Sequence, residues 1–143
     1  MAGETTVLPA NAGRLFYQNP GAGMFACEFS LTYGAAQNEL ADVMEAGFIP
    51  AYAKVYAVGW YPTDMDTNAT PTVVHKVTVN AVDIVSGLTG AQAATPSFTP
   101  VSSAAAATAT SASAQKVTVT TTTAAATGAA GTARLVLFCQ TAT

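Results

Sequence analysis

The sequence predicts an all-β protein, and more narrowly a single-domain β-sandwich of jelly-roll-like type. Short runs in which apolar and polar residues alternate recur along the chain, and segments rich in Thr, Ser, Gly and Pro separate them. Helical periodicity is nearly absent. A chain of 143 residues suits one domain with one sizeable core. We expect an extended N-terminal arm over residues 1–20 and a sandwich domain over residues 21–143.

The N-terminal arm is predicted because residues 1–20 contain Thr, Pro, Asn and Gly without a sustained period. One short strand is expected within it, near residues 14–17. The first clear strand follows at residues 25–33, where every second residue is apolar and large or Cys. One face of this strand should therefore be buried. The residues on that face are Phe25, Cys27, Phe29, Leu31 and Tyr33.

Residues 34–47 are open to two interpretations. Asn38 is a suitable N-cap for a short helix, Leu40, Val43 and Met44 have helical spacing, and a glycine follows at position 47. A loop or an edge strand fits these residues about as well. Either element should end at Pro50.

Residues 48–85 are expected to form the central hairpin, with strands at 53–61 and 72–80 and a polar turn over 62–71. Both faces of the first strand are apolar, with Tyr56 and Trp60 on one of them, so we expect burial on both sides or contact with another subunit. Gly59 indicates a bulge or a close approach. The apolar residues from Val82 onward either extend this run or begin a further strand.

The remaining chain is predicted to hold a long surface excursion and two more strands. Residues 91–114 are low in complexity, dominated by Ala, Ser and Thr, and contain only Phe98 and Val101 as large apolar anchors. A strand is expected at 115–123, where β-branched residues alternate, and the last strand at 132–141. The turn between these strands carries Gly128 and Gly131.

Composition limits the classes of partner. Charged residues make up 9% of the chain, against about 25% in ordinary soluble domains. Such a surface favours coverage by partners or by copies of the same chain. The five Lys and Arg residues are scattered and the net charge is −3, so nucleic-acid binding is not expected.

We expect synthesis in a cytoplasm and no membrane insertion. The first residues lack the basic start and apolar core of a signal peptide, and no apolar run approaches the roughly 20 residues that span a bilayer. Cys27 and Cys139 are interpreted as small buried hydrophobic residues, reduced in that compartment. A disulfide between them requires that their strands be neighbours.

No catalytic or metal-binding pattern emerges. His75 is the only histidine, and no Gly-x-Ser-x-Gly nucleophile elbow accompanies it, so we interpret it as a packed or interfacial strand residue. Residues 64–68 (DMDTN) match the start of a calcium loop, but Ala69 replaces the required glycine and His75 the bidentate glutamate. Asx turns are the favoured reading. We expect no enzyme activity, no cofactor and no metal.

Four aromatic residues cluster on and around the 53–61 strand. Aromatic faces stack on sugars, so the cluster fits a glycan platform, but the shortage of convergent polar groups nearby favours core packing or subunit contact. The residues are Tyr52, Tyr56, Trp60 and Tyr61.

Three segments resemble a known family, namely residues 49–55 (IPAYAKV), 66–72 (DTNATPT) and 131–137 (GTARLVL). They are similar to "IPAGA-x-V", "DTN-x-SPT" and the closing "A-x-GT-x-x-x-x-V" of small structural proteins encoded in the head modules of tailed bacteriophages. The resemblance runs from about Ile49 to the C-terminus. Tyr52 stands where that family usually has Gly, and residues 91–114 have no counterpart.

The resemblance implies a non-enzymatic virion protein that decorates or cements the capsid. Such a protein would be made in the host cytoplasm, would sit on the capsid exterior and would bind adjacent major capsid subunits and copies of itself, as a homodimer or homotrimer. A fibre, tail or neck component and a carbohydrate-binding β-sandwich module are the alternatives. The candidate contact residues are Thr5, Val7, Leu8, Arg14, Phe16, Tyr17, Tyr56, Trp60, Phe98 and Val101.

Overall fold

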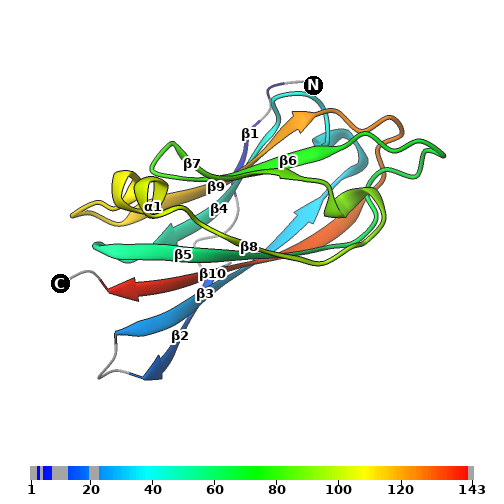
Figure 1. The fold of residues 1–143 in the computed structure, drawn as a ribbon. Coiled ribbons are helices and arrows are strands. Elements are labelled where there is room, and N and C mark those ends of the chain that lie inside the picture. Colours follow the sequence, from blue (N-terminus) through cyan, green and yellow to red (C-terminus); the bar gives the residue numbers. More distant parts are fainter. Residues whose placement is uncertain (1–2, 4, 8–12, 20–22, 142–143) are drawn as a thin grey trace.

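A computed structural model describes residues 3, 5–7, 13–19 and 23–141 and shows a β-sandwich of two stacked sheets (Figure 1). The strands are β1 Thr5–Val7, β2 Gly13–Asn19, β3 Met24–Tyr33, β4 Val43–Ile49, β5 Ala53–Pro62, β6 Val74–Val79, β7 Val82–Leu88, β8 Ser97–Pro100, β9 Gln115–Thr123 and β10 Gly131–Thr141. One short α-helix, α1 Ser103–Ala109, and two 3-10 turns, η1 Ala35–Gln37 and η2 Gly90–Gln92, complete the regular structure of these residues.

The sheet order is that of a jelly roll. Sheet A has the order β1-β4-β9-β6-β7 and sheet B the order β2-β3-β10-β5-β8. The antiparallel pairs are nested, because β3 pairs with β10, β4 with β9, β5 with β8 and β6 with β7. This is the pattern of one long hairpin rolled up into two sheets. The predicted all-β sandwich of jelly-roll-like type is confirmed.

The core fills the space between the two sheets. Alternation in β3 buries Phe29 and Leu31 to 1% exposure, and alternation in β10 buries Leu135 and Leu137 to 0%. Sheet A contributes a matching set of valines, such as Val77 and Val119. Because side chains of a strand point to opposite faces in turn, the same pattern leaves a second, outward face on each sheet.

The N-terminal segment carries two edge strands. β1 pairs in parallel with β4 at the edge of sheet A, and β2 pairs antiparallel with β3 at the edge of sheet B. The short strand expected near residues 14–17 thus lies within β2. Residues 5–7 and 13–19 are parts of the sandwich rather than an arm separate from it.

The predicted hairpin between residues 53–61 and 72–80 is wrong in its pairing. Both strands exist, as β5 and β6, but β5 belongs to sheet B and β6 to sheet A. The polar segment between them crosses from one sheet to the other. In the rolled topology β5 pairs with β10 and β8, whereas β6 pairs with β9 and β7.

The helix considered for residues 38–47 does not form. Asn38 is 2% exposed and its Oδ1 lies 2.9 Å from Nε2 of His75, so its side chain packs in the core instead of capping a helix. The segment is a short 3-10 turn followed by β4, which ends just before Pro50 as expected. A register shift between Glu45 and Gly47 breaks the strict alternation of β4.

The low-complexity segment 91–114 has more regular structure than its composition predicts. Residues 97–100 form β8 at the edge of sheet B, and residues 103–109 form α1. Ser102 caps the helix by accepting a hydrogen bond from the backbone N–H of Ala105. Ala106 and Ala109 are each 3% exposed, and α1 packs against β7 and β5.

The two cysteines lie on neighbouring strands, and both are buried and free. Cys27 is opposite Leu137, while Cys139 is opposite Phe25, so the thiols are diagonal neighbours. A hydrogen bond with the Cys27 thiol, together with burial, raises the pKa of Cys139. The interpretation of both residues as small buried side chains is confirmed.

Candidate functional site

The outward face of sheet B carries a row of apolar residues, of which Phe98 and Pro100 are exposed whereas Val136 and Ala57 are only 9% and 6% exposed. In β10, Val136 and Phe138 point away from the core, on the opposite side from Leu135 and Leu137. In neighbouring β5 the residues paired with them are Gly59 and Ala57, and in β8 the next residues across are Phe98 and Pro100. On the other side of β10, Phe138 pairs with Ala26 of β3. We call these residues the sheet B patch.

Phe98 is the most prominent residue of the sheet B patch, with 62% of its surface exposed. Its ring packs against Phe138 with the centroids 5.5 Å apart and the planes tilted by 60°. This is an edge-to-face geometry that aromatic pairs prefer. Ala57 has a small side chain and Gly59 has none, so the surface of the sheet beside these rings is lower than the rings themselves. The result is a shallow apolar surface with a raised aromatic rim.

Gly59 has a steric role in this surface. A Cβ atom at Gly59 would lie 2.8 Å from Cε2 of Tyr61, a distance that only a shift of the ring would relieve. The absence of a side chain therefore lets Tyr61 lie across β5. The close approach expected at this glycine is confirmed, whereas the bulge lies elsewhere.

The bulge of β5 is at Tyr56. Phe138 pairs with Ala57 and the next residue of β10, Cys139, pairs with Val55, so Tyr56 is the extra residue. Because of this insertion the alternation changes phase and Tyr56 becomes 44% exposed. Its hydroxyl donates a hydrogen bond to Oε1 of Gln140. Tyr56 thus stands on the outward side of sheet B, next to the patch.

One ion pair on this side of sheet B joins β10 to β3. The guanidinium of Arg134 lies 4.8 Å from the centroid of the Tyr61 ring, and its Nε lies 3.7 Å from Oε1 of Glu28. Both side chains are partly solvent-exposed, so the ion pair itself contributes little stability. This pair balances one positive and one negative charge beside the patch, and Lys54 of β5, which is opposite Gln140, is a further positive charge on the same side.

Two of the predicted contact residues are wrong as surface anchors. Trp60 is 0% exposed and Val101 is 9% exposed, so both lie in the core. The change of phase at Tyr56 turns Trp60 inward, although strict alternation from Tyr56 would place the two residues on one face. The largest ring of the aromatic cluster is therefore packed in the core, which agrees with the favoured interpretation, and Tyr52 and Tyr56 are its exposed members.

The other predicted contact residues lie near the edges. Arg14, Phe16 and Tyr17 are in β2, at the edge of sheet B, where Phe16 is the register partner of Ala26. Thr5 and Val7 are in β1, at the edge of sheet A. Leu8 lies outside the described residues.

Besides Tyr52, three exposed apolar residues of the described chain were absent from the predicted contact residues. Met24, Leu40 and Phe48 are 51%, 56% and 59% exposed, and the partly buried Phe138, also absent from that set, underlies Phe98. Residues 132–141 carry apolar side chains on both faces of the predicted strand. This pattern indicated an apolar outward face that includes Phe138. Phe48 lies on β4 of the opposite sheet, in the strand that the sequence did not define.

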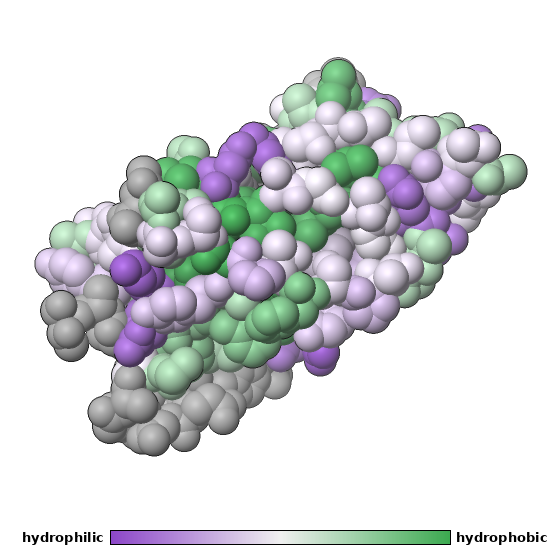
Figure 2. Space-filling model, viewed as in Figure 1, coloured by the Kyte–Doolittle hydropathy of each residue, from purple (hydrophilic) through white to green (hydrophobic). Residues whose placement is uncertain are grey.

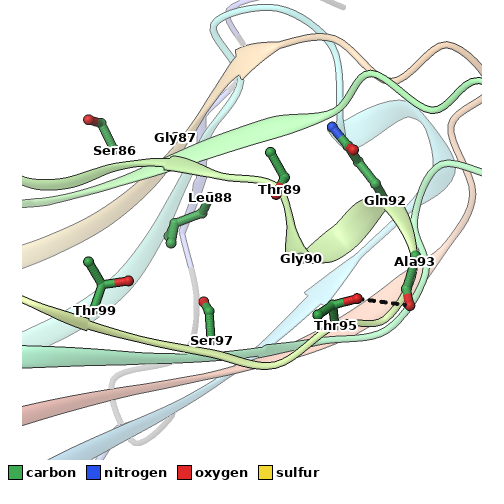
Figure 3. A pocket seen from close by; sticks show the side chains of 10 residues that line it. All are labelled: Ser86, Gly87, Leu88, Thr89, Gly90, Gln92, Ala93, Thr95, Ser97 and Thr99. Atoms are coloured by element: carbon green, nitrogen blue, oxygen red, sulfur yellow. Dashed lines mark hydrogen bonds between the residues drawn. The ribbon is translucent and has the colours of Figure 1, made fainter.

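A groove of about 320 Å³ opens between the edges of the two sheets. Figure 3 shows Leu88 of β7 and Ser97 of β8 pointing toward one another across it, with η2 at one end. In Figure 2 hydrophobic residues show through between the two layers on this side. The lining residues are uncharged and mostly small: Ser86, Gly87, Leu88, Thr89, Gly90, Gln92, Ala93, Thr95, Ser97 and Thr99.

Asp66 organises the crossing between β5 and β6. Its carboxylate accepts hydrogen bonds from the backbone N–H groups of Asn68, Thr72, Val73, Ala126 and Thr127, at distances of 2.7 to 3.4 Å. Burial alone would raise the pKa of this carboxyl, but these N–H groups favour the charged form and lower its pKa to about 2. The Asx turns expected at residues 64–68 are confirmed.

His75 is packed in the core, as expected. It is 0% exposed, and its ring lies 5.5 Å from that of Trp60 and 5.8 Å from that of Tyr33, between centroids. Burial lowers the pKa of His75 to about 4. Within the described residues, no three His, Cys, Asp or Glu side chains group as metal ligands. The helices among those residues are all too short and polar to cross a bilayer.

Comparisons with known proteins identify structural relatives. No protein-family model matches the sequence, and no curated protein matches it significantly. A chain in the capsid of Ralstonia phage GP4 superposes with a TM-score of 0.75 and 24% identity, over 91% of this chain and 92% of that one. A chain in the capsid asymmetric unit of cyanophage Pam1 gives a TM-score of 0.70 and 24% identity, over 94% and 97%. The jelly-roll sandwich described above is therefore, almost from end to end, the fold of chains found in two phage capsids.

Proposed function

We propose that this chain is a structural protein of a tailed-bacteriophage capsid, which decorates the outside of the shell and cements it by binding adjacent major capsid subunits. The observation that carries the proposal is the fold likeness to two capsid chains, which covers more than 90% of both partners in each comparison. The family resemblance of residues 49–55 and 66–72 supports it independently. Its action is mechanical, so we propose no catalytic step.

The sheet B patch is the surface that we assign to contact with the shell. Phe98 and Tyr56 supply exposed aromatic area, which carries much of the binding energy in protein interfaces. β2 lies at the edge of the same sheet, so Arg14, Phe16 and Tyr17 are proposed to extend the contact. Thr5 and Val7, in sheet A, are proposed to reach a neighbouring subunit.

We also propose that copies associate on the shell as a homodimer or homotrimer. Few charges and an exposed apolar face both favour association. A glycan-binding module is less well supported, since the one tryptophan lies in the core. A tail, fibre or neck location predicts that the protein fractionates with those parts of the virion instead of with heads.

The test is cosedimentation of the purified protein with expanded capsids that lack it. Saturable binding at a fixed copy ratio to the major capsid protein is the expected result. A soluble, stable protein that does not bind these capsids at any concentration contradicts the proposal.

A matched pair of variants tests the surface. Phe98→Lys places a charge in the sheet B patch and should weaken capsid binding by about tenfold or more. Phe48→Lys is the control, because Phe48 is almost equally exposed, at 59% against 62%, but lies on sheet A. Equal binding by both variants would reject the sheet B patch while leaving the capsid role intact.

A further inference from the structure

Four buried polar atoms at one end of the core have no hydrogen-bond partner among the described residues. They are the hydroxyl of Tyr33, Nδ2 of Asn38, Nε1 of Trp60 and Nδ1 of His75. The four residues are between 0% and 3% exposed. A buried polar group without a partner is destabilising, so these atoms call for partners that the described residues do not supply.

The four residues form one contact group that spans both sheets. His75 is on β6 of sheet A, while Tyr33 and Trp60 are on β3 and β5 of sheet B. The ring contacts of 5.8 and 5.5 Å join both aromatic residues to His75, and the 2.9 Å contact with Nε2 joins Asn38 to it. These four residues thus form one node between the layers, with Asn38 on the Nε2 side of His75.

The hydrogen-bonding types of these atoms identify the ligand. Because Nε2 of His75 faces the carbonyl oxygen of Asn38, Nε2 carries the proton and Nδ1 is left as an acceptor. Trp60 Nε1 and Asn38 Nδ2 can only donate, whereas the Tyr33 hydroxyl can do either. The ligand must therefore donate and accept at once. An anion cannot donate to Nδ1, and a metal ion cannot accept from an indole N–H.

We propose that this node binds an ordered internal water molecule, which donates a hydrogen bond to Nδ1 of His75 and accepts one from Nε1 of Trp60. The Tyr33 hydroxyl is a further polar group available to it, whereas the Asn38 amide lies on the opposite, Nε2 side of the imidazole ring. Buried waters typically make about three hydrogen bonds to groups that the protein leaves unpaired. This water links sheet A to sheet B where the two layers meet beside the β5–β6 crossing. The inference is independent of the proposed capsid role.

Solution NMR of the isotope-labelled protein tests the site, because the chain has one His and one Trp and their ring signals need no further assignment. We expect a cross-relaxation peak between the Trp60 indole proton and water, with the sign of a long-lived bound water rather than of chemical exchange. The nitrogen shifts of His75 should show a neutral ring protonated at Nε2. Absence of the water peak, or a ring protonated at Nδ1, overturns the proposal.

A pair of tyrosine variants gives a second measurement. Tyr33→Phe keeps the ring and removes the hydroxyl from the node, so it should shift the ring signals of both His75 and Trp60. Tyr56→Phe removes a hydroxyl from the outward side of sheet B and should leave these signals unchanged. Unchanged signals in Tyr33→Phe would remove that hydroxyl from the site and contradict a node shared by the four residues.

Discussion

Tyr52 has a backbone conformation that is unfavourable for any residue with a Cβ atom. Its φ is +61°, in the left-handed region that costs a residue with a Cβ about 1–2 kcal/mol. The phage proteins that this sequence resembles usually have Gly at this position, and the backbone geometry supplies the reason. The turn is held by a hydrogen bond of 2.7 Å from the Tyr52 N–H to the carbonyl of Ser111, which does not depend on the side chain.

We therefore expect Tyr52→Gly to stabilise the fold by about 0.5–1 kcal/mol, since relief of the backbone strain exceeds the added entropy of the unfolded chain. Tyr52 is 53% exposed, so little packing is lost. Thermal unfolding measures the change. Ala51→Gly is the control, because the preceding residue does not have a positive φ and the same substitution there should destabilise. Destabilisation by both changes would mean that the Tyr52 ring contributes more than its geometry costs.

His75 makes stability depend on pH in a defined window. The folded pKa is about 4, below the usual 6.5, so the unfolded chain binds the proton more readily. Its neutral ring contributes fully above pH 6.5, and this contribution is lost as the pH falls toward 4. The full loss amounts to about 3 kcal/mol. Protonation of Asp66 reduces the stability only below this window, because its pKa is lowered to about 2.

The prediction is that the free energy of unfolding in urea decreases between about pH 7 and about pH 4.5 in the wild-type protein and changes much less in His75→Gln. The residues packed around His75 are Tyr33, Trp60 and Asn38. Only Tyr33 among them is titratable, and burial raises its pKa, so it stays neutral across this pH range. An equal pH slope in the variant would assign the effect to other groups.

At the level of elements, the sequence predicted the strands that alternate regularly and missed those that do not. β9 was predicted with its exact ends, and β3, β5 and β10 to within one residue at each end. β4 was left open between helix, loop and edge strand, because the register shift near Gly47 interrupts the period of two. Bulges of this kind depend on the partner strand and are not visible in one segment alone.

Helix α1 escaped prediction for a different reason. Its buried positions are Ala106 and Ala109, and in a run of alanines a buried residue cannot be told from an exposed one. The helix packs against β5 and β7, which lie elsewhere in the sequence. The helix sequence alone therefore contains no hydrophobic pattern that identifies its buried side. The composition of residues 103–109 was thus compatible with either order or disorder.

If α1 is an integral part of the fold, then Ala106→Asp should destabilise the protein by about 2–4 kcal/mol, because it places an unpaired charge in the core. Ser103→Asp is the control at an exposed position in the first turn, where a negative charge is tolerated or slightly favourable. Chemical denaturation distinguishes them. A segment that contributes nothing to the fold would give two variants of equal stability.

For the whole molecule, the strand pairing was beyond the reach of sequence reasoning. Residues 53–62 and 74–79 are close in the chain and separated by turn residues, which is the usual signature of a hairpin. In the folded protein β5 pairs with β8 and β6 with β7 in nested order, and rolling the chain also places β5 beside β10 and β6 beside β9. The candidate contact residues contain a separate error, which comes from the bulge in β5. Tyr56 and Phe98 were placed correctly at the surface, but Trp60 faces inward.

The two strands that border the open side of the sandwich are poor templates for a further strand. β7 contains Gly87, whose φ of +71° interrupts a regular ladder, and β8 has four residues and ends at Pro100, which has no N–H to donate. Long, flat strand edges seed fibrils, and a surface with few charges does little to oppose them. A protein that accumulates in many copies would gain from such interrupted edges, since they keep it dispersible where electrostatic repulsion is weak.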